Sequence, residues 1–536
     1  MTNTHAPIAG SERKPLPGAV ATGRTNANAT IEVSIKLRRK RALPELTGRP
    51  SAIITRQQLR DTYGASQADI DKLVQTLKPF GLSVVQESLA SRTVSLRGPV
   101  SAMEAAFQVK LFNYAHAGGS YRGRVGAVQI PVGLKDVVQG VFGLDNRQVA
   151  RRRRQPVREN THARLASVPS AWYTPSELAS HYNFPPGDGS GQTVGLLEFG
   201  GGFFANDLKK FCALAKIPNP PTVTAVSTDG TPTDSRDGAE GEVMLDVEVV
   251  AGVCPKAHIV VYFANWSEQG WLTILDAAVQ DQTNNPTVLS ISWGNAEDTD
   301  VWTKQAMEQI NQTLQDAAMI GVTVCVAAGD DGSSDAVSDG LAHVDFPSSS
   351  PFALAVGGTT IPAKGVQQPD ILWKEGDGLR SDNGGSTGGG VSAIFPRPNW
   401  QSNISIQSVN PGAIVGRCIP DLAANADWNA SPYLLVVDGQ PQPNGGTSAA
   451  SPLVASLLTL INSTRTPGKP VGYITPVLYQ PNGNGGTPPG AIACTDVQSG
   501  DNNTDSIGGY SAGPGYDAAS GWGTPNGVKL AQALPS

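Results

Sequence analysis

The sequence of 536 residues is poor in histidine and has no long apolar run. Only six histidines occur, and none lies in an obvious His-Gly context, so a conventional Ser–His catalytic pair has no clear base. No run of about 18 apolar residues is found, and we expect no membrane span. The opening stretch, MTNTHAPIAGSERKPLPGAV, lacks an apolar segment of signal-peptide type, so we expect any export not to use a standard secretory leader.

Cysteine is also scarce, which excludes a densely disulfide-bonded scaffold. The five cysteines are scattered, odd in number and without the spacing of a metal site. We therefore expect small buried apolar side chains and at most one or two disulfides. They are Cys212, Cys254, Cys325, Cys418 and Cys494.

Charge is divided unevenly along the chain. Residues 1–164 hold 26 Lys and Arg against 11 Asp and Glu, a net charge of +15, whereas residues 165–536 hold 14 against 35, a net charge of −21. A basic half can bind nucleic acid, or it can pair with the acidic half of its own chain. No recognisable nucleic-acid module or aromatic-interleaved basic motif occurs, so we favour the second interpretation.

The composition divides the chain into four segments. Residues 1–30, rich in Gly, Pro, Thr and Asn, are predicted to be disordered. Residues 31–150 combine strand-like and helical stretches, typical of a compact α+β domain. Residues 151–172, RRRRQPVRENTHARLASVPSAW, are polar and Arg-rich and read as a linker open to proteolysis. Residues 173–536 form the main domain.

The main domain alternates apolar strand-like runs with helical stretches. The runs include TVGLLEF, HIVVYFA, TVLSISWG, VTVCVAAG and FALAVGG. Such alternation predicts an α/β fold with a mainly parallel sheet covered by helices on both faces. Chemistry in these sheets gathers beyond the carboxyl ends of the strands. Two of those ends carry Trp293, in SISWG, and Asp330, in VAAGDDG.

A nucleophile and a base without imidazole can be identified. Ser448 lies in NGGTSAASPLVASLLTLIN, where a Gly-Gly-Thr turn precedes a helix whose N-terminus would stabilise developing negative charge. The segment GAEGEVMLDVEVVAG carries Glu242 and Asp246, which share a face whether it is a strand or a helix. Two neighbouring carboxylates do not ionise easily together, so one can act as a base. An exposed acidic face is the alternative interpretation.

The order of the motifs GGTSAASP, GEVMLDVEVVAG, SISWG, AAGDDG and STGGGVS closely resembles that of the sedolisins, or serine-carboxyl peptidases, and especially their kumamolisin-like members. The resemblance extends over nearly the whole chain. It implies a subtilisin-like fold, a parallel sheet flanked by helices, in which glutamate replaces the catalytic histidine. It also implies that residues 31–150 are an inhibitory activation domain, or prodomain, of ferredoxin-like α+β fold.

The resemblance assigns a role to each matching residue. It implies that Ser448 is the nucleophile, Glu242 the general base, Asp246 its orienting partner and Asp330 the oxyanion-hole residue. It further implies that Glu198, in LLEFGGG, and Trp293 extend the hydrogen-bond network behind Glu242.

An aspartic acid in an oxyanion hole has a consequence for pH. It donates a hydrogen bond only while protonated, and an ordinary Asp, with a pKa of ~3.9, is mostly protonated only in acid. We therefore expect an acid-active endopeptidase precursor that cuts protein or peptide substrates. The basic prodomain would be held by charge at neutral pH and removed autocatalytically in acid.

The tail TDVQSGDNNTDSIGGYSAGPGYDAASGWG is rich in oxygen donors suited to a hard cation. A plain polar loop is the alternative. The resemblance implies one structural Ca²⁺, held by carboxylates and backbone carbonyls. These ligands would be Asp496, Val497, Gly513, Gly515 and Asp517.

Three further residues are candidates for a substrate subsite. The stretch STGGGVS lacks the Lys-Ser/Thr of a phosphate-binding loop, so Gly388 and Gly389 read as an edge along which a peptide backbone lies. Asp345 either favours a basic substrate side chain or caps a turn.

Two other functions compete with a peptidase. A non-enzymatic binding protein would require a broken catalytic constellation, yet all four of its residues are present. An esterase or lipase would require a Gly-x-Ser-x-Gly elbow and a downstream histidine, and GTSAAS has neither. We also expect the mature protein to act outside the cell.

Overall fold

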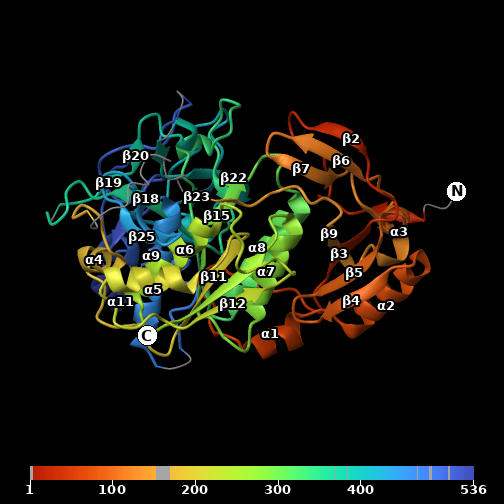
Figure 1. Ribbon diagram of the computed structural model, residues 1–536, viewed down its shortest axis with the longest axis horizontal. Helices are drawn as coiled ribbons and strands as arrows, with labels where there is room; N and C mark the ends of the chain where they lie inside the picture. The colour runs from red at the N-terminus through yellow and green to blue at the C-terminus, as the bar shows by residue number, and fades with distance from the viewer. Residues whose placement is uncertain are drawn as a thin grey trace.

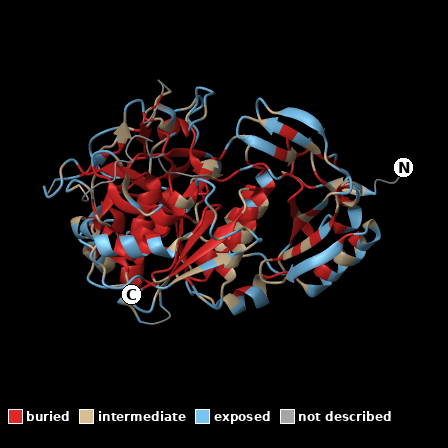
Figure 2. Cartoon of the chain, viewed as in Figure 1, coloured by how far each residue is buried: buried red, intermediate tan, exposed pale blue. Residues whose placement is uncertain are grey.

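The computed structural model describes residues 4–152, 169–366, 368–382, 384–466, 469–481, 486–504 and 507–535. Figure 1 shows an N-terminal domain, in red and orange, beside a larger C-terminal domain coloured from yellow to blue. Each domain has its own buried apolar core, as Figure 2 shows. None of the helices in these described ranges is long and apolar enough to cross a membrane.

The C-terminal domain is built on an eight-stranded sheet that confirms the predicted α/β fold. Its strands, in spatial order, are β12 (Val223–Ser227), β13 (His258–Ala264), β11 (Thr193–Phe199), β14 (Val288–Ile291), β16 (Thr323–Ala327) and β18 (Leu354–Thr360), the last flanked by β24 (Leu422–Asn425) and β19 (Ile371–Leu372). All neighbours are parallel except β18 and β19. The central strands are buried except for the first residues of β11 and β13, as expected for a sheet covered on both faces.

Helices cover this sheet on two sides. The helices α6 (Glu240–Val253) and α9 (Thr447–Ser463) pack together, and α9 lies along β14, β16, β18 and β24. The helices α7 (Glu268–Gln280) and α8 (Lys304–Met319) pack together on the side of the N-terminal domain (Figure 1). Smaller helices are α4 (Pro175–His181), α5 (Ala205–Leu214), α10 (Pro489–Ala493) and α11 (Gly527–Ala533).

The N-terminal domain has the predicted ferredoxin-like arrangement. Its four-stranded antiparallel sheet has the order β4 (Ser83–Ser88), β5 (Thr93–Pro99), β3 (Thr30–Leu37) and β9 (Val138–Phe142). Its helices are α1 (Arg56–Tyr63), α2 (Gln67–Leu77) and α3 (Val100–Phe107). The chain therefore runs β-α-β-β-α-β through this sheet. A smaller sheet joins β2 (Val20–Arg24), β6 (Phe112–His116) and β7 (Gly119–Gly123).

The prediction that residues 1–30 are disordered is wrong for the described part of that segment. The strand β1 (His5–Pro7) pairs with β8 (Gln129–Pro131), and β2 pairs with β6. Ile8 is buried in the domain core, and Arg13 is buried too. Order here comes from partners about a hundred residues away, so a composition rule based on neighbouring residues does not detect it.

Opposite charges meet where the two domains join. Arg13 pairs with Glu268 at 2.8 Å, Lys36 with Asp276 at 2.5 Å and Arg39 with Asp316 at 2.8 Å. The acidic partners all belong to α7 and α8. The interpretation that the basic half of the chain pairs with its own acidic half agrees with these contacts.

Of the expected linker, residues 153–168 lie outside the described residues. Its first two residues form β10 (Arg151–Arg152), which pairs antiparallel with β15 (Trp293–Ala296). All five cysteines are unpaired; four are buried, and Cys494 is half-buried.

Candidate active site

The predicted catalytic residues lie at the carboxyl end of the parallel sheet. Glu198 is the next-to-last residue of β11, Trp293 follows β14, and Asp330 follows β16. The helix starts that carry Glu242 and Ser448, in α6 and α9, lie at the same edge. The segment around Glu242, ambiguous between strand and helix, is a helix, so Glu242 and Asp246 lie one turn apart.

Ser448 is fully buried in the first turn of α9. The preceding Gly446 adopts a φ of 89°, a left-handed conformation that favours glycine. Its amide donates to Ala426 O at 2.7 Å, which fixes the turn into the helix. The Ser448 hydroxyl donates to the carbonyl oxygen of Ser292 at 3.5 Å.

Ser292 connects the nucleophile candidate to the carboxyl groups. Its hydroxyl donates to Asp246, at 2.9 and 2.8 Å from the two carboxyl oxygens, and lies 3.2 Å from Ser448 O. Asp246 in turn shares a hydrogen bond with Glu198. The indole nitrogen of Trp293 donates to Glu198 Oε2 at 2.9 Å. The structure thus brings Glu198, Asp246 and Trp293 into one buried network.

This network favours protonated carboxyl groups. Burial raises the pKa of Glu198 to about 8, against the opposing hydrogen bond from Trp293 and with the help of the charge on Glu242. Burial also raises the pKa of Asp246 well above its ordinary value, and the charges on Glu198 and Glu242 raise it further. Glu242, itself fully buried, is therefore near enough to both groups to influence their ionisation. Glu198 and Asp246 therefore hold their protons more strongly than exposed carboxyl groups do.

Asp330 is bound to the residue directly before the nucleophile candidate. Its Oδ1 accepts a hydrogen bond from the Thr447 amide at 2.8 Å and another from the Thr447 hydroxyl at 2.7 Å. Its own carbonyl accepts from the Ser386 amide at 3.0 Å. Asp330 is fully buried. Its position beside the start of α9 suits a group that contacts an oxyanion formed at Ser448.

Sequence reasoning missed Ser292 and Thr447. Both are small hydroxyl residues next to predicted site residues, Trp293 and Ser448, and this adjacency was the available signal. Their contacts join segments more than a hundred residues apart, so their importance depended on the fold.

The three subsite candidates lie near the same edge. Asp345 belongs to β17 (Asp345–Phe346), which pairs with β15, and a Cβ on Gly294 would be only 2.0 Å from Asp345 Oδ1. A Cβ on Gly388 would lie 2.0 Å from Ala328 O, and one on Gly389 would lie 2.5 Å from Ala518 O. Close approach to the chain's own backbone therefore explains the need for glycine at both positions.

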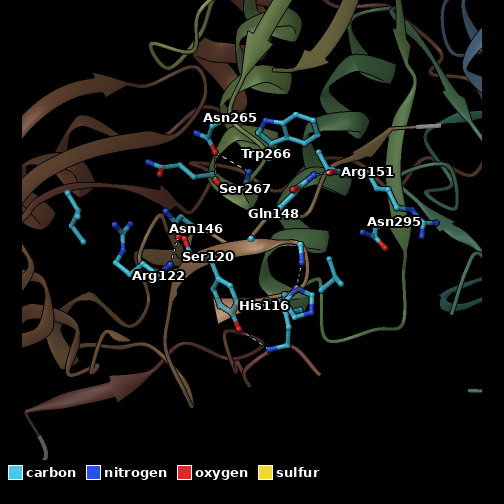
Figure 3. Close-up of a pocket in the computed structure, with 18 of the residues that line it drawn as sticks. His116, Ser120, Arg122, Asn146, Gln148, Arg151, Asn265, Trp266, Ser267 and Asn295 are labelled. Carbon is cyan, nitrogen blue, oxygen red and sulfur yellow. Dashed lines mark hydrogen bonds between the residues drawn. The ribbon is translucent and has the colours of Figure 1, made fainter. Parts of the chain in front are cut away.

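The exit of the N-terminal domain runs into this region. Figure 3 shows Gln148 and Arg151 beside Trp266 and Asn295, around a cavity of about 850 Å³ between the domains. The amide of Val149 donates to Trp266 O at 2.8 Å, and Asn295 donates to Val149 O at 3.1 Å. In the β10–β15 pairing, Arg151 is opposite Gly294 and Arg152 is opposite Trp293. The chain is therefore directed toward Ser292 and Ser448.

Arg151 is held by acidic side chains next to Asp330. Its guanidinium lies 2.8 Å from Asp335 Oδ1 and 3.4 Å from Asp331 Oδ2. Asp331 also pairs with Arg380 at 2.5 Å. Although burial alone would raise it, the pKa of Asp331 is lowered by the charges and hydrogen bonds of Arg380 and by Arg151. Asp331 is therefore an ionised anchor for this segment.

The predicted calcium residues are close to one another in the C-terminal loop. The Gly515 amide donates to Asp496 Oδ2 and the Gly513 amide to Asp517 Oδ2, both at 3.1 Å. Burial raises the pKa of Asp517, and backbone donors oppose that rise. Asp496 Oδ1 is buried without a hydrogen-bond partner among the described residues. No group of three or more His, Cys, Asp or Glu side chains forms a metal cluster in this described part of the chain.

Comparisons with known proteins agree with this geometry. The Pro-kumamolisin activation domain matches residues 17–147, and the Subtilase family matches residues 224–477. The chain is 40% identical to Kumamolisin of Bacillus sp. (strain MN-32), over 98% of this chain and 96% of that protein. It is 29% identical to Sedolisin of Pseudomonas sp. (strain 101), over 96% of this chain and 88% of that protein.

A solved structure supports the same relationship. Pseudomonas sedolisin, a serine-carboxyl proteinase complexed with two molecules of pseudo-iodotyrostatin, has a TM-score of 0.57 and 28% identity, covering 67% of this chain and 97% of that one. The buried serine and carboxyl groups at the carboxyl end of a subtilisin-like sheet are consistent with that likeness. The chain therefore belongs to the sedolisin family of serine-carboxyl peptidases, as a kumamolisin-like serine-type peptidase that carries a pro-kumamolisin activation domain.

Proposed function

We propose that the chain is the precursor of an acid-active endopeptidase that cuts peptide bonds through an acyl-enzyme on Ser448. The observation that carries the proposal is the double link around that serine. Ser292 connects Ser448 to Asp246, and Thr447 connects the same helix start to Asp330. A nucleophile, a carboxyl cluster and an oxyanion-hole candidate thereby converge on one point.

In the proposed reaction, the Ser448 oxygen forms a bond to the substrate carbonyl carbon while its proton passes to Glu242. The oxyanion accepts a hydrogen bond from protonated Asp330. Glu242 then gives the proton to the leaving amine as the C–N bond breaks. Water attacks the acyl-enzyme, Glu242 takes the proton of the water, and the Ser448 hydroxyl is restored. Asp246 acts as the orienting partner of Glu242, and Glu198 and Trp293 support Asp246.

The acid optimum can be tested at Asp330. Asparagine donates through its amide at any pH, whereas aspartic acid donates only when protonated. We expect Asp330→Asn to keep activity in acid and to raise hydrolysis at neutral pH by about tenfold or more relative to the parent. The measurement is kcat/KM for a denatured protein substrate as a function of pH. A parent enzyme with peak activity at about pH 8 would contradict the mechanism.

The activation domain is proposed to inhibit the enzyme within the same chain. Its exit strand enters the catalytic region in register with β15 and is directed toward Ser448. Autocatalytic cleavage would fall within residues 151–172. The ion pairs with α7 and α8 would weaken in acid as their carboxylates gain protons, which favours release. We also propose that the precursor is exported and that the mature enzyme acts outside the cell.

One structural Ca²⁺ is proposed for the C-terminal loop. The partnerless oxygen of Asp496 and the buried carboxyl of Asp517 suit a hard cation. These two carboxylates would hold the ion together with the carbonyls of Val497, Gly513 and Gly515. Bound Ca²⁺ would neutralise the two charges and tie the loop down.

Removal of Ca²⁺ should then affect stability. We expect EDTA to lower the thermal midpoint by several degrees, because a ligand bound only by the folded state stabilises it. Asp496→Asn should give the same lower midpoint with or without EDTA. If EDTA left the thermal midpoint of the parent protein unchanged, the proposed Ca²⁺ site would be excluded.

A further inference from the structure

A second cavity between the domains has a charge pattern unlike the rest of their interface. It measures about 850 Å³ and lies beside Thr287 and Val322, which precede β14 and β16, and so at the opposite end of the sheet from Ser448. Residues 49–57 of the activation domain form one wall. Arg465, Lys469 and Pro470, after α9, contribute to the other.

The charged residues that line this cavity are all cations. Arg49 and Arg56 come from the activation domain, and Arg465 and Lys469 come from the catalytic domain. No carboxylate is among its described lining residues. Elsewhere the described ion pairs across the interface join a cation to an acid. Like charges that face each other across a docked interface oppose docking unless a counter-charge lies between them.

The hydrogen bonds described for Arg56 and Arg465 go to uncharged oxygens, although the charge on Asp281 also acts on Arg56. Arg56 donates to Val279 O at 2.7 Å and to Pro286 O at 2.8 Å. Arg465 donates to Lys469 O at 3.1 Å and to Pro535 O at 2.5 Å. Backbone carbonyls satisfy these donors but carry no net charge. The nearby carboxylate of Asp281 receives hydrogen bonds from Tyr262, Thr283 and Asn284 and does not line the cavity.

Arg49 and Lys469 are the members available to a ligand. Within the described ranges, neither side chain has a hydrogen bond or an ion pair. Burial and the charge of Arg465 lower the pKa of Arg49, which agrees with two guanidinium groups held near each other without an anion. Guanidinium and ammonium groups in such a cluster match the geometry and charge of phosphoryl oxygens.

We propose that this cavity binds a multiply charged phosphate anion that bridges the activation domain and the catalytic domain. The volume of about 850 Å³ leaves room for a condensed phosphate as well as for orthophosphate. The complete site exists only while the domains are docked. The anion therefore stabilises the inhibited precursor and slows loss of the activation domain. The effect on release rests on the proposed function, but binding of the anion does not.

The test uses the full-length chain with Ser448→Ala, which keeps it uncleaved. Calorimetric titration at about pH 7, with ionic strength matched by sodium chloride, compares tripolyphosphate with orthophosphate. We expect one saturable site for tripolyphosphate. Arg49→Gln and Lys469→Gln change one residue on each domain. Each should raise the dissociation constant of tripolyphosphate by about tenfold or more, because each removes one charge-assisted contact. Lys72→Gln, on the distant helix α2, removes the same charge and should leave affinity unchanged.

The functional readout is the loss of intact parent chain after acidification. Tripolyphosphate at about nine times its dissociation constant should slow this loss by about tenfold, because the ligand binds the docked state. Absence of binding by the intact chain, or binding by Arg49→Gln and Lys469→Gln as tight as that of the Ser448→Ala chain without them, would overturn the site. If the anion binds but the parent chain never processes itself in acid, the proposed function fails and the anion site stands.

Discussion

Replacement of Ser448 by alanine is expected to lower kcat by about 10⁴- to 10⁶-fold and to leave the precursor uncut in acid. The hydroxyl is the group that becomes acylated, and the adjacent hydroxyl of Thr447 is engaged in a hydrogen bond to Asp330. The loss should appear in kcat, because the proposed subsite residues Asp345, Gly388 and Gly389 remain in place. Single-turnover hydrolysis of a peptide at about pH 4, together with mass spectrometry of the acidified precursor, measures both effects.

A matched control lies on the same helix. Ser456 is buried two turns further along α9, where its hydroxyl donates to Pro452 O at 2.7 Å. Ser456→Ala should fold and retain hydrolysis. If Ser448→Ala kept more than a few per cent of the activity of Ser456→Ala, an acyl-enzyme on Ser448 would be excluded.

Glu242→Gln is expected to lower kcat by about 10²- to 10⁴-fold, the typical contribution of a general base. Glutamine retains the size of the side chain but cannot accept the proton of Ser448. Glu240→Gln is the matched control, since Glu240 lies in the same first turn of α6 and makes a local hydrogen bond to the Gly238 amide. Equal activities of the two variants would show that the base is another group.

The effect of Glu242→Gln on the pH dependence of thermal stability is a second test, and it does not depend on turnover. Glu198 has a pKa of about 8 in the folded protein against 4.5 for an ordinary glutamate, so the folded state keeps a proton that the unfolded chain releases. The stability that this group contributes is complete below about pH 4.5 and is lost as pH rises toward about 8. The thermal midpoint should fall across that window.

Removal of the charge at position 242 should make that fall shallower, because that charge helps to raise the pKa of Glu198. The measurement is the thermal midpoint from about pH 5 to 8, made on the Ser448→Ala background. A steeper fall in Glu242→Gln, or one identical to that of the Ser448→Ala parent, would contradict the proximity of the two groups.

The sequence by itself indicated the family and the α/β class, and it predicted the serine of the GGTS turn as the nucleophile. These features depend on local order: apolar runs of strand length, a Gly-Gly-Thr turn before a helix, and acidic residues four apart. Charge composition also indicated that the two domains pair, because a net charge can be counted without knowledge of contacts.

Only the tertiary structure decided which groups act together. Ser292 contacts Asp246 and Thr447 contacts Asp330 across long stretches of chain, and residues 4–30 owe their order to distant strands. The exit strand at Arg151 and the cation-lined cavity arise from docking of the two domains. Hydrogen bonds and strong electrostatic interactions need groups that are close in space, whatever their separation along the chain. The proton-holding carboxyl cluster therefore exists only when the fold brings β11 and α6 together.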